Sequence, residues 1–317
     1  MKTPTISWKL VRRIAGMVAT ALLCLIMFVS DRFLYLSHER FPRLAYLQLN
    51  RRTTLGTHDS RPEIIGHRGS GLESLDWKQN GLLIGNTRAA IKAALEHADW
   101  IEIDVRKTAD SPPNLVCFHD AELDKKTDGS GVVSEKELDD LKKLTTQVPH
   151  FEGGPERILT LEEVLAEFDS TDRQWIIDIK SEGISDQVLE LLSRYDLTPD
   201  RVILFGDHEV LQQYRNTKFP RGYTALAATH PNMLYSHSSV LQRCSDESYD
   251  YLVVPTVFVT LELGADCAAR NISLWSYDSN DVRDLEYVVN CGVRGLIVDK
   301  PQDIKHHFGR SAASTPP

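Results

Sequence analysis

The chain has 317 residues, of which 42% are hydrophobic and 26% charged, and its net charge at pH 7 is −9. These values are typical of a globular protein with an ordinary core, and the length fits one large domain such as an α/β barrel of roughly 250 residues. The part of the chain after residue 60 is acidic, which argues against nucleic acid as a partner because phosphate-backbone binding needs a basic surface.

Residues 14–36 are predicted to form a transmembrane anchor. Residues 14–30 carry no charge, and a basic tail, 1–13, precedes them. The run is apolar on every face and reaches the lower limit for a spanning helix. A cleaved signal peptide is the alternative, but no clear small-x-small cleavage site follows the run. The basic flank favours a single-pass protein with a cytoplasmic N-terminus and its body on the opposite, periplasmic or extracytoplasmic side.

The remainder divides into a basic and polar linker, 37–60, a barrel body, 61–305, and a C-terminal tail, 306–317, that is predicted to be disordered. The chain has five cysteines and no CxxC pair, so we expect neither a zinc ribbon nor a thioredoxin-type site. A disulfide between Cys244 and Cys267 stays open, since sequence alone does not determine pairing.

From residue 63 onward, short apolar runs alternate with helical patterns. Several runs are continuously apolar, as expected for strands that are covered on both faces. The predicted strands are Glu63–Gly66, Trp100–Val105, Leu115–Phe118, Trp175–Ile179, Val202–Phe205, Thr224–Ala227, Tyr251–Val254, Ser273–Tyr277 and Gly295–Val298.

Helices are predicted between most of these strands. Asn86 is a suitable N-cap for the first helix, Thr87–His97. Thr160 followed by Glu163 forms a capping box before a helix that runs to about Phe168. Two further helices are predicted at Asp186–Tyr195 and Asp281–Asn290.

Nine strands are one too many for a (β/α)8 barrel. The gap between Val105 and Leu115 is shorter than the dozen or so residues that a helical crossover needs, so these two runs should form a hairpin-like pair. The sequence therefore predicts a TIM (β/α)8 barrel with a hairpin-like insertion after the second strand. A doubly wound open sheet is the main rival.

Ionisable side chains stand at the ends of four predicted strands. Because the C-terminal ends of barrel strands meet at one mouth, where active sites occur, we expect these side chains to converge. They are His67, Arg68, Glu102, Asp104, His119, Asp178 and Lys180.

Glu102 and Asp104 are two residues apart and so share one face of a strand, where two carboxylates repel unless a cation joins them. Oxygen ligands suit Mg²⁺, Ca²⁺ or Mn²⁺, and Asp178 could complete the set from another strand. Two histidines could act as general acid and base, and Arg68 could pair with a phosphate. Taken singly, each residue also has an ordinary structural explanation, such as a strand-end ion pair; their co-occurrence favours function.

Seven strings resemble the glycerophosphodiester phosphodiesterase family, in the PI-PLC-like phosphodiesterase superfamily, over about residues 63–303: IIGHRGSG, NTRAAIKAAL, IEIDVRKTAD, LVCFHDAELDKKTDGSG, WIIDIK, ISLWSYD and GLIVDKP. The resemblance implies a TIM barrel, a divalent cation (Mg²⁺ or Ca²⁺), and cleavage of glycerophosphodiesters to glycerol 3-phosphate and an alcohol. The predicted anchor adds lysophospholipid-like lipids, which would give a lysophosphatidate, to the substrate class.

By position, the resemblance assigns three roles. His67 and His119 would be the catalytic pair, with the substrate hydroxyl beside the phosphate as nucleophile; which histidine is acid and which is base stays open. The metal ligands would be Glu102, Asp104 and Asp178. The substrate contacts would be Arg68, Lys180 and Trp275, with Trp275 lining the mouth.

The sequence departs from the family pattern at two positions. Gly85 stands where the family usually has a glutamate, a role for which Glu73 or Asp76 could substitute, and Asp178 is one methylene shorter than the usual glutamate. Two rival functions stay open: a phospholipase C- or D-like enzyme that releases a cyclic phosphate, and a non-catalytic, membrane-tethered binding protein.

Overall fold

The structure is a computed structural model that describes residues 61–72, 83–146, 155–170, 172–225 and 237–311. The predicted tail 1–13, anchor 14–36 and linker 37–60 lie outside the described residues. None of the described helices combines the length and the apolar character that a membrane crossing requires.

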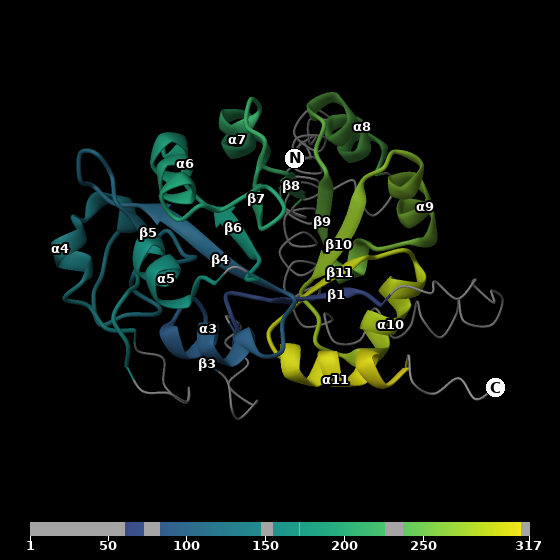
Figure 1. Ribbon diagram of the computed structural model, residues 1–317, viewed down its shortest axis with the longest axis horizontal. Helices are drawn as coiled ribbons and strands as arrows, with labels where there is room; N and C mark the ends of the chain where they lie inside the picture. Colours follow the sequence, from purple (N-terminus) through teal and green to yellow (C-terminus); the bar gives the residue numbers. More distant parts are fainter. Residues whose placement is uncertain (1–60, 73–82, 147–154, 171, 226–236, 312–317) are drawn as a thin grey trace, which may run out of the picture. The chain divides into compact units, whose positions relative to one another are not determined.

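Eight parallel strands close into a barrel (Figure 1). Closure depends on the first strand, which pairs with the last strand on one side and with β4 on the other. This closure confirms the predicted barrel and rules out the open doubly wound sheet. The strands are β1 (Glu63–Gly66), β4 (Trp100–Lys107), β6 (Trp175–Ile179), β7 (Val202–Gly206), β8 (Arg221–Thr224), β9 (Tyr251–Pro255), β10 (Ser273–Tyr277) and β11 (Gly295–Val298).

The hairpin-like insertion is present. The ninth strand, β5 (Leu115–Cys117), pairs antiparallel with the end of β4, with Cys117 opposite Val105. The residues that follow β5 have a small apolar core of their own. They contain η1 (Val133–Glu135) and α4 (Leu138–Leu141). Outside the insertion, before β4 in the chain, β2 (Gly71–Leu72) and β3 (Leu83–Ile84) form a separate two-stranded sheet.

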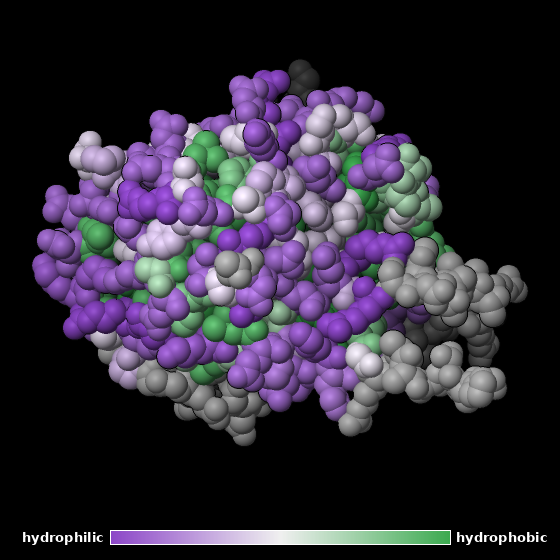
Figure 2. Space-filling model, in the orientation of Figure 1, coloured by the Kyte–Doolittle hydropathy of each residue, from purple (hydrophilic) through white to green (hydrophobic). Residues whose placement is uncertain are grey.

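Helices cover the outside of the barrel (Figure 1), and their buried residues form two large apolar clusters with the outward-facing strand residues. On the face shown in Figure 2, hydrophilic side chains dominate the described surface, as expected when apolar faces point inward. The helical segments are α3 (Arg88–Leu95), α5 (Leu161–Phe168), α6 (Ser185–Arg194), α7 (His208–Leu211), η2 (Gln212–Tyr214), α8 (Ser238–Glu247), η4 (Thr256–Phe258), α9 (Leu261–Ala269), α10 (Val282–Asn290) and α11 (Pro301–Ser311).

Two helix starts tested the capping predictions. Thr160 and Glu163 form the predicted capping box at the start of α5. The cap predicted for α3 is wrong: Thr87 is the N-cap and accepts a hydrogen bond from the backbone N–H of Ala90. Asn86 has a positive φ of 62°, and its side chain is used elsewhere.

The fifth barrel strand lies three residues earlier than predicted, at Arg221–Thr224 instead of Thr224–Ala227. Its first two residues, Arg221 and Gly222, are not typical strand residues. Arg221 is buried and donates from its guanidinium to the carbonyl oxygen of Glu247. Gly222 is needed because a Cβ there would lie 2.3 Å from the ring of Phe205.

The disordered tail predicted for 306–317 is wrong for its first residues, because α11 continues to Ser311. Phe308 packs against the outer apolar cluster, and the ring Nε2 of His307 lies 2.9 Å from Oε1 of Glu286 on α10. Residues 312–317 lie outside the described residues. Cys244 and Cys267 are both buried and free, so the possible disulfide between them is not formed.

One half of the barrel interior is apolar. Its cluster takes residues from strands all around the barrel, and aromatic rings dominate it: the Trp275 ring centroid lies 4.8 Å from that of Tyr251 and 6.3 Å from that of Trp100. Charged groups cannot be accommodated there without large desolvation costs. The buried acidic side chains of β4 and β6 lie outside this apolar cluster.

Candidate active site

Three buried carboxylates meet at the C-terminal ends of β4 and β6. Asp104 and Asp178 are direct neighbours in the parallel register of the two strands, and Glu102 lies two residues earlier on the face that Asp104 shares. Their side-chain oxygens lie within 4.8 Å of one another. Glu102, Asp104 and Asp178 are only 3%, 1% and 8% exposed, so their charges interact in a medium of low dielectric.

Two basic side chains lie against these acids. Lys180 Nζ is 2.7 Å from Oδ2 of Asp178 and 3.2 Å from Oδ1 of Asp104. Arg68 Nε is 2.9 Å from Oδ2 of Asp104, and the backbone N–H of Arg68 donates to Oε2 of Glu102 at 2.6 Å. Arg68 and Lys180 thus share the same small volume as the acids, as the sequence predicts.

The pKa values of the two carboxylates of β4 are shifted in opposite directions. Burial, together with the charges of Asp104 and Asp178, raises the pKa of Glu102 well above its usual range. Burial alone would also raise the pKa of Asp104, but Arg68 and Lys180 outweigh it and hold that pKa below its usual range. The described protein groups therefore favour the charged form of Asp104 and the neutral form of Glu102.

The chemistry of this cluster fits a hard divalent cation. All its donors are carboxylate oxygens, the ligands that Mg²⁺ and Ca²⁺ prefer. Oδ1 of Asp178 is buried and has no hydrogen-bond partner among the residues that the structure describes. A buried carboxylate oxygen without a donor is costly, and a cation would remove that cost.

His67 follows β1 and is held by residues from the other end of the chain. Its ring Nδ1 lies 2.7 Å from Oδ1 of Asp299, the residue after β11. Asn280 donates to Oδ2 of Asp299 at 2.6 Å and accepts from the Asp299 backbone N–H at 2.9 Å. Burial alone would raise the pKa of Asp299. The hydrogen bond and the charge of His67, with the hydrogen bond from Asn280, outweigh burial and lower that pKa, so Asp299 is ionised.

His119 follows β5 and has its own carboxylate partner. Its ring Nδ1 lies 2.9 Å from Oδ1 of Asp120. Burial, with a contribution from the positive charges of Arg68 and Lys180, lowers the pKa of His119 to about 4. In both histidines a carboxylate oxygen therefore lies beside Nδ1 and orients the ring.

Asn86 and Gly85 explain the first departure from the family pattern. The Asn86 side chain donates to Oδ2 of Asp104 at 2.9 Å and accepts from the Asp104 backbone N–H at 3.0 Å. A Cβ on Gly85 would lie 2.8 Å from Cβ of Arg68, so the glycine allows the arginine stem to lie against the backbone. The suggested substitutes, Glu73 and Asp76, lie outside the described residues.

Trp275 is the one predicted site residue that does not join the others. It is fully buried in the apolar half of the barrel, where Gly295 leaves room for it: a Cβ there would lie 2.5 Å from the indole ring. The prediction that Trp275 lines the mouth is therefore wrong. Tyr277 lies two residues further along the same face of β10, is half-buried, and is close enough to Asp178 and Lys180 to interact with their charges.

The sequence pattern missed several residues that complete the site. Asp299 could have been found, because it directly follows the last predicted strand within the string GLIVDKP. Asn280, by contrast, lies in a loop with no local signal of its role. The residues that were missed are Asn86, Asp120, Asn280 and Asp299.

Comparisons with known proteins identify the family of this chain. The model of the glycerophosphoryl diester phosphodiesterase family matches residues 67–303. A glycerophosphodiester phosphodiesterase of Caldanaerobacter subterraneus is 28% identical over 251 residues, which cover 76% of this chain and 95% of that protein. One of Bacillus subtilis is 33% identical over 238 residues, which cover 66% of this chain and 76% of that protein.

Solved structures share the fold. A putative glycerophosphoryl diester phosphodiesterase from Agrobacterium tumefaciens has a TM-score of 0.68 at 18% identity; the match covers 80% of this chain and 100% of that one. A phosphodiesterase from Oleispira antarctica, solved with the product sn-glycerol-3-phosphate, has a TM-score of 0.63 at 23% identity and covers 80% and 97%. With the family match over most of the body, this chain is a phosphodiesterase that belongs to the glycerophosphoryl diester phosphodiesterase family.

Proposed function

We propose that this enzyme uses a divalent cation, Mg²⁺ or Ca²⁺, to hydrolyse a glycerophosphodiester or a lysophospholipid-like substrate. The products are glycerol 3-phosphate or a lysophosphatidate, and an alcohol. One observation carries the proposal: three buried acids and two carboxylate-oriented histidines meet at one end of the barrel. The sn-glycerol-3-phosphate complex of the Oleispira relative supports the product class.

Glu102, Asp104 and Asp178 would hold the cation, which supplies electrostatic stabilisation of the charge that develops on the phosphate oxygens. Arg68 and Lys180 already lie beside these acids and are placed to pair with the phosphate. Their fixed positions orient the phosphorus before reaction, which lowers the entropic part of the barrier.

The two histidines move the protons. Burial lowers the pKa of His119 to about 4, so its ring is neutral near pH 7 and can accept the proton of the substrate hydroxyl beside the phosphate. That oxygen attacks phosphorus, and the bond to the leaving alcohol breaks. His67, whose Nδ1 proton is held by ionised Asp299, can carry a second proton on Nε2 and give it to the leaving oxygen. Water then opens the cyclic phosphate, with the two roles reversed.

We infer that the N-terminal segment anchors the enzyme at a membrane. The uncharged run within residues 14–36 and the basic tail before it support a single-pass anchor with a cytoplasmic N-terminus. The catalytic body would lie on the periplasmic or extracytoplasmic side. Such an anchor keeps the barrel close to lipid, which is the reason to include lysophospholipids in the substrate class.

The test uses the full chain in detergent with Mg²⁺ or Ca²⁺ and a panel of glycerophosphodiesters and lysophospholipids, and follows products by phosphorus NMR. We expect a phosphomonoester as the end product. His67→Ala and His119→Ala should each lower kcat at least about 10²-fold, because each removes one proton-transfer group. An end product that stays cyclic, or no turnover of any substrate at full cation occupancy, would reject the hydrolytic reaction.

A further inference from the structure

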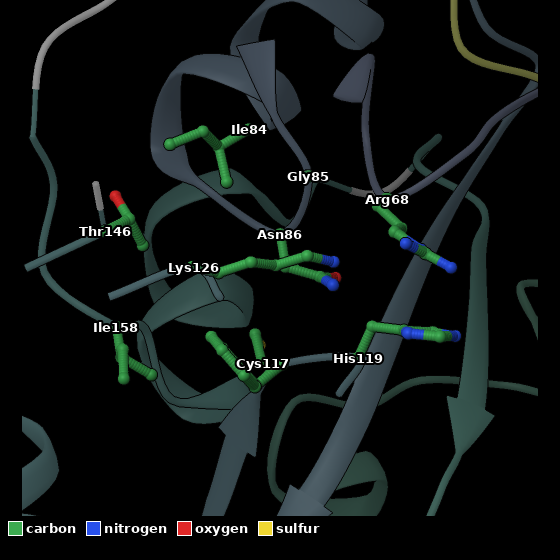
Figure 3. A pocket seen from close by; sticks show the side chains of 10 residues that line it. Arg68, Ile84, Gly85, Asn86, Cys117, His119, Lys126, Thr146 and Ile158 are labelled. Carbon is green, nitrogen blue, oxygen red and sulfur yellow. The ribbon is translucent and has the colours of Figure 1, made fainter. Parts of the chain in front are cut away.

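A second lysine enters the site from the insertion after β5. Figure 3 shows Lys126 reaching past Asn86 toward the space between Arg68 and His119. These four side chains line one pocket, whose remaining wall comes from β3, β5 and the insertion. Lys126 lies in the insertion and not on a barrel strand. The rule that side chains at strand ends converge therefore did not predict it.

The backbone around Lys126 is fixed. Leu123 is fully buried in the core of the insertion, and the buried hydroxyl of Thr127 donates to the Leu123 carbonyl oxygen at 3.0 Å. The side chain of Lys126 itself is only 17% exposed. A lysine held this firmly has already lost most of the side-chain entropy that binding a ligand would otherwise cost.

The charges around this lysine fit an anion. Its Nζ lies 3.6 Å from Oδ2 of Asp120, and an ammonium group carries three N–H donors, so it can contact more than one acceptor. Burial and the nearby positive charge of Arg68 lower its pKa to about 8. Two like charges at one pocket repel each other, and an anion bound between them reverses that cost.

We propose that Lys126 is a substrate-binding residue that, with Arg68, binds a nonbridging oxygen of the phosphodiester from the side of His119. This inference rests on the proposed function, which supplies the phosphate-bearing substrate. The phosphate then lies between the strand-end acids with their cation and a cationic wall built by the insertion. The site suits a tetrahedral phosphodiester group with one negative charge, because cationic groups face it from more than one side.

The experiment measures sn-glycerol 3-phosphate binding by calorimetry, and kcat and KM for a glycerophosphodiester, with full-length protein and saturating cation. Lys126→Met keeps the stem and removes the charge. We expect it to weaken product affinity and raise KM by about tenfold or more, as for loss of one charge-assisted hydrogen bond. Lys126→Arg should restore most of the affinity, whereas Lys125→Met, a neighbouring exposed lysine with the same charge change, should behave as wild type.

Two outcomes would overturn the inference. One is a Lys126→Met enzyme whose product affinity equals that of wild type. The other is a variant that lowers kcat alone and matches Asp120→Asn, since that pattern means Lys126 acts only through Asp120 on His119. Calorimetry needs no turnover, so a wild-type enzyme that hydrolyses no glycerophosphodiester rejects the proposed function while the binding data still decide the role of Lys126.

Discussion

At the scale of single residues, the site is built from pairs in which a partly or fully buried partner fixes a reactive group. Asp299 fixes His67, Asp120 fixes His119, and Asn86 fixes Asp104. The first and third pairs join residues from separate segments of the chain, whereas His119 and Asp120 are neighbours in one loop. In all three pairs the contact orients the reactive atoms before the substrate arrives. Such support commonly changes activity by tenfold to a hundredfold when it is removed.

Asp299→Asn tests this orientation. The amide removes the negative charge that holds the Nδ1 proton of His67, and its own N–H₂ group competes for the wrong tautomer. We expect kcat to fall at least about tenfold while KM changes little. Asp303→Asn is the matched control, because Asp303 is exposed in the first turn of α11. Unchanged kcat in Asp299→Asn would show that the Nδ1 contact does not serve catalysis.

The sequence could predict which residues meet, but not how deep each one lies. Glu102, Asp104 and Asp178 follow from the rule that strand ends converge at one mouth, because the rule needs only the strand boundaries. Trp275 was misplaced for a specific reason. The alternation of a strand gives the face on which a side chain lies, whereas its height along the barrel axis depends on the register with β11, where Gly295 opens a space for the ring.

At the scale of elements, boundaries were predictable where the pattern was local. The capping box at Thr160 and the hairpin after β4 depend on neighbouring residues and were predicted correctly. Strand β8 begins with buried Arg221 and with Gly222, neither of which has strand character; only the packing of Phe205 and the carbonyl groups near α8 explains them. The extension of α11 likewise depends on contacts with α10 and the outer apolar cluster.

Close packing between elements predicts a contrast between two helical glycines. A Cβ at Gly264 in α9 would lie 1.7 Å from the carbonyl oxygen of Cys291, whereas a Cβ at Gly309 in α11 would meet nothing within 4 Å. Gly264→Ala must push α9 away from the end of α10, so we expect a loss of about 1–3 kcal/mol in the free energy of unfolding. The loss is measured by denaturant titration.

Gly309→Ala makes the same chemical change at an open helical position. It should leave stability unchanged or raise it by about 0.5–1 kcal/mol, because alanine favours helix more than glycine does. Equal effects of the two substitutions would contradict the close approach of α9 to Cys291.

At the scale of the whole described body, the site exists only when the barrel is closed. His67, which follows the first strand, pairs with Asp299 after the last strand, 232 positions further along the chain. The acids lie on the two strands that follow β1 around the barrel. A cation bound by Glu102, Asp104 and Asp178 therefore binds the folded state and not the unfolded chain. Binding of this kind stabilises the fold by about 2.7 kcal/mol at a cation concentration 100 times Kd.

This linkage predicts a pH-dependent shift in thermal stability. In the cation-free protein Glu102 keeps a proton because its pKa is raised, and the cation must displace that proton to bind. As pH rises toward the raised pKa of Glu102, the proton is displaced more easily, so the gain in Tm on adding Mg²⁺ or Ca²⁺ should increase with pH below that pKa and level off above it. Chelation should reverse the gain. Glu102→Gln carries no displaceable proton, so its gain in Tm on adding the cation should be smaller and should not vary with pH. A gain in Tm of the wild type that does not vary with pH would mean that Glu102 is already ionised before the cation binds.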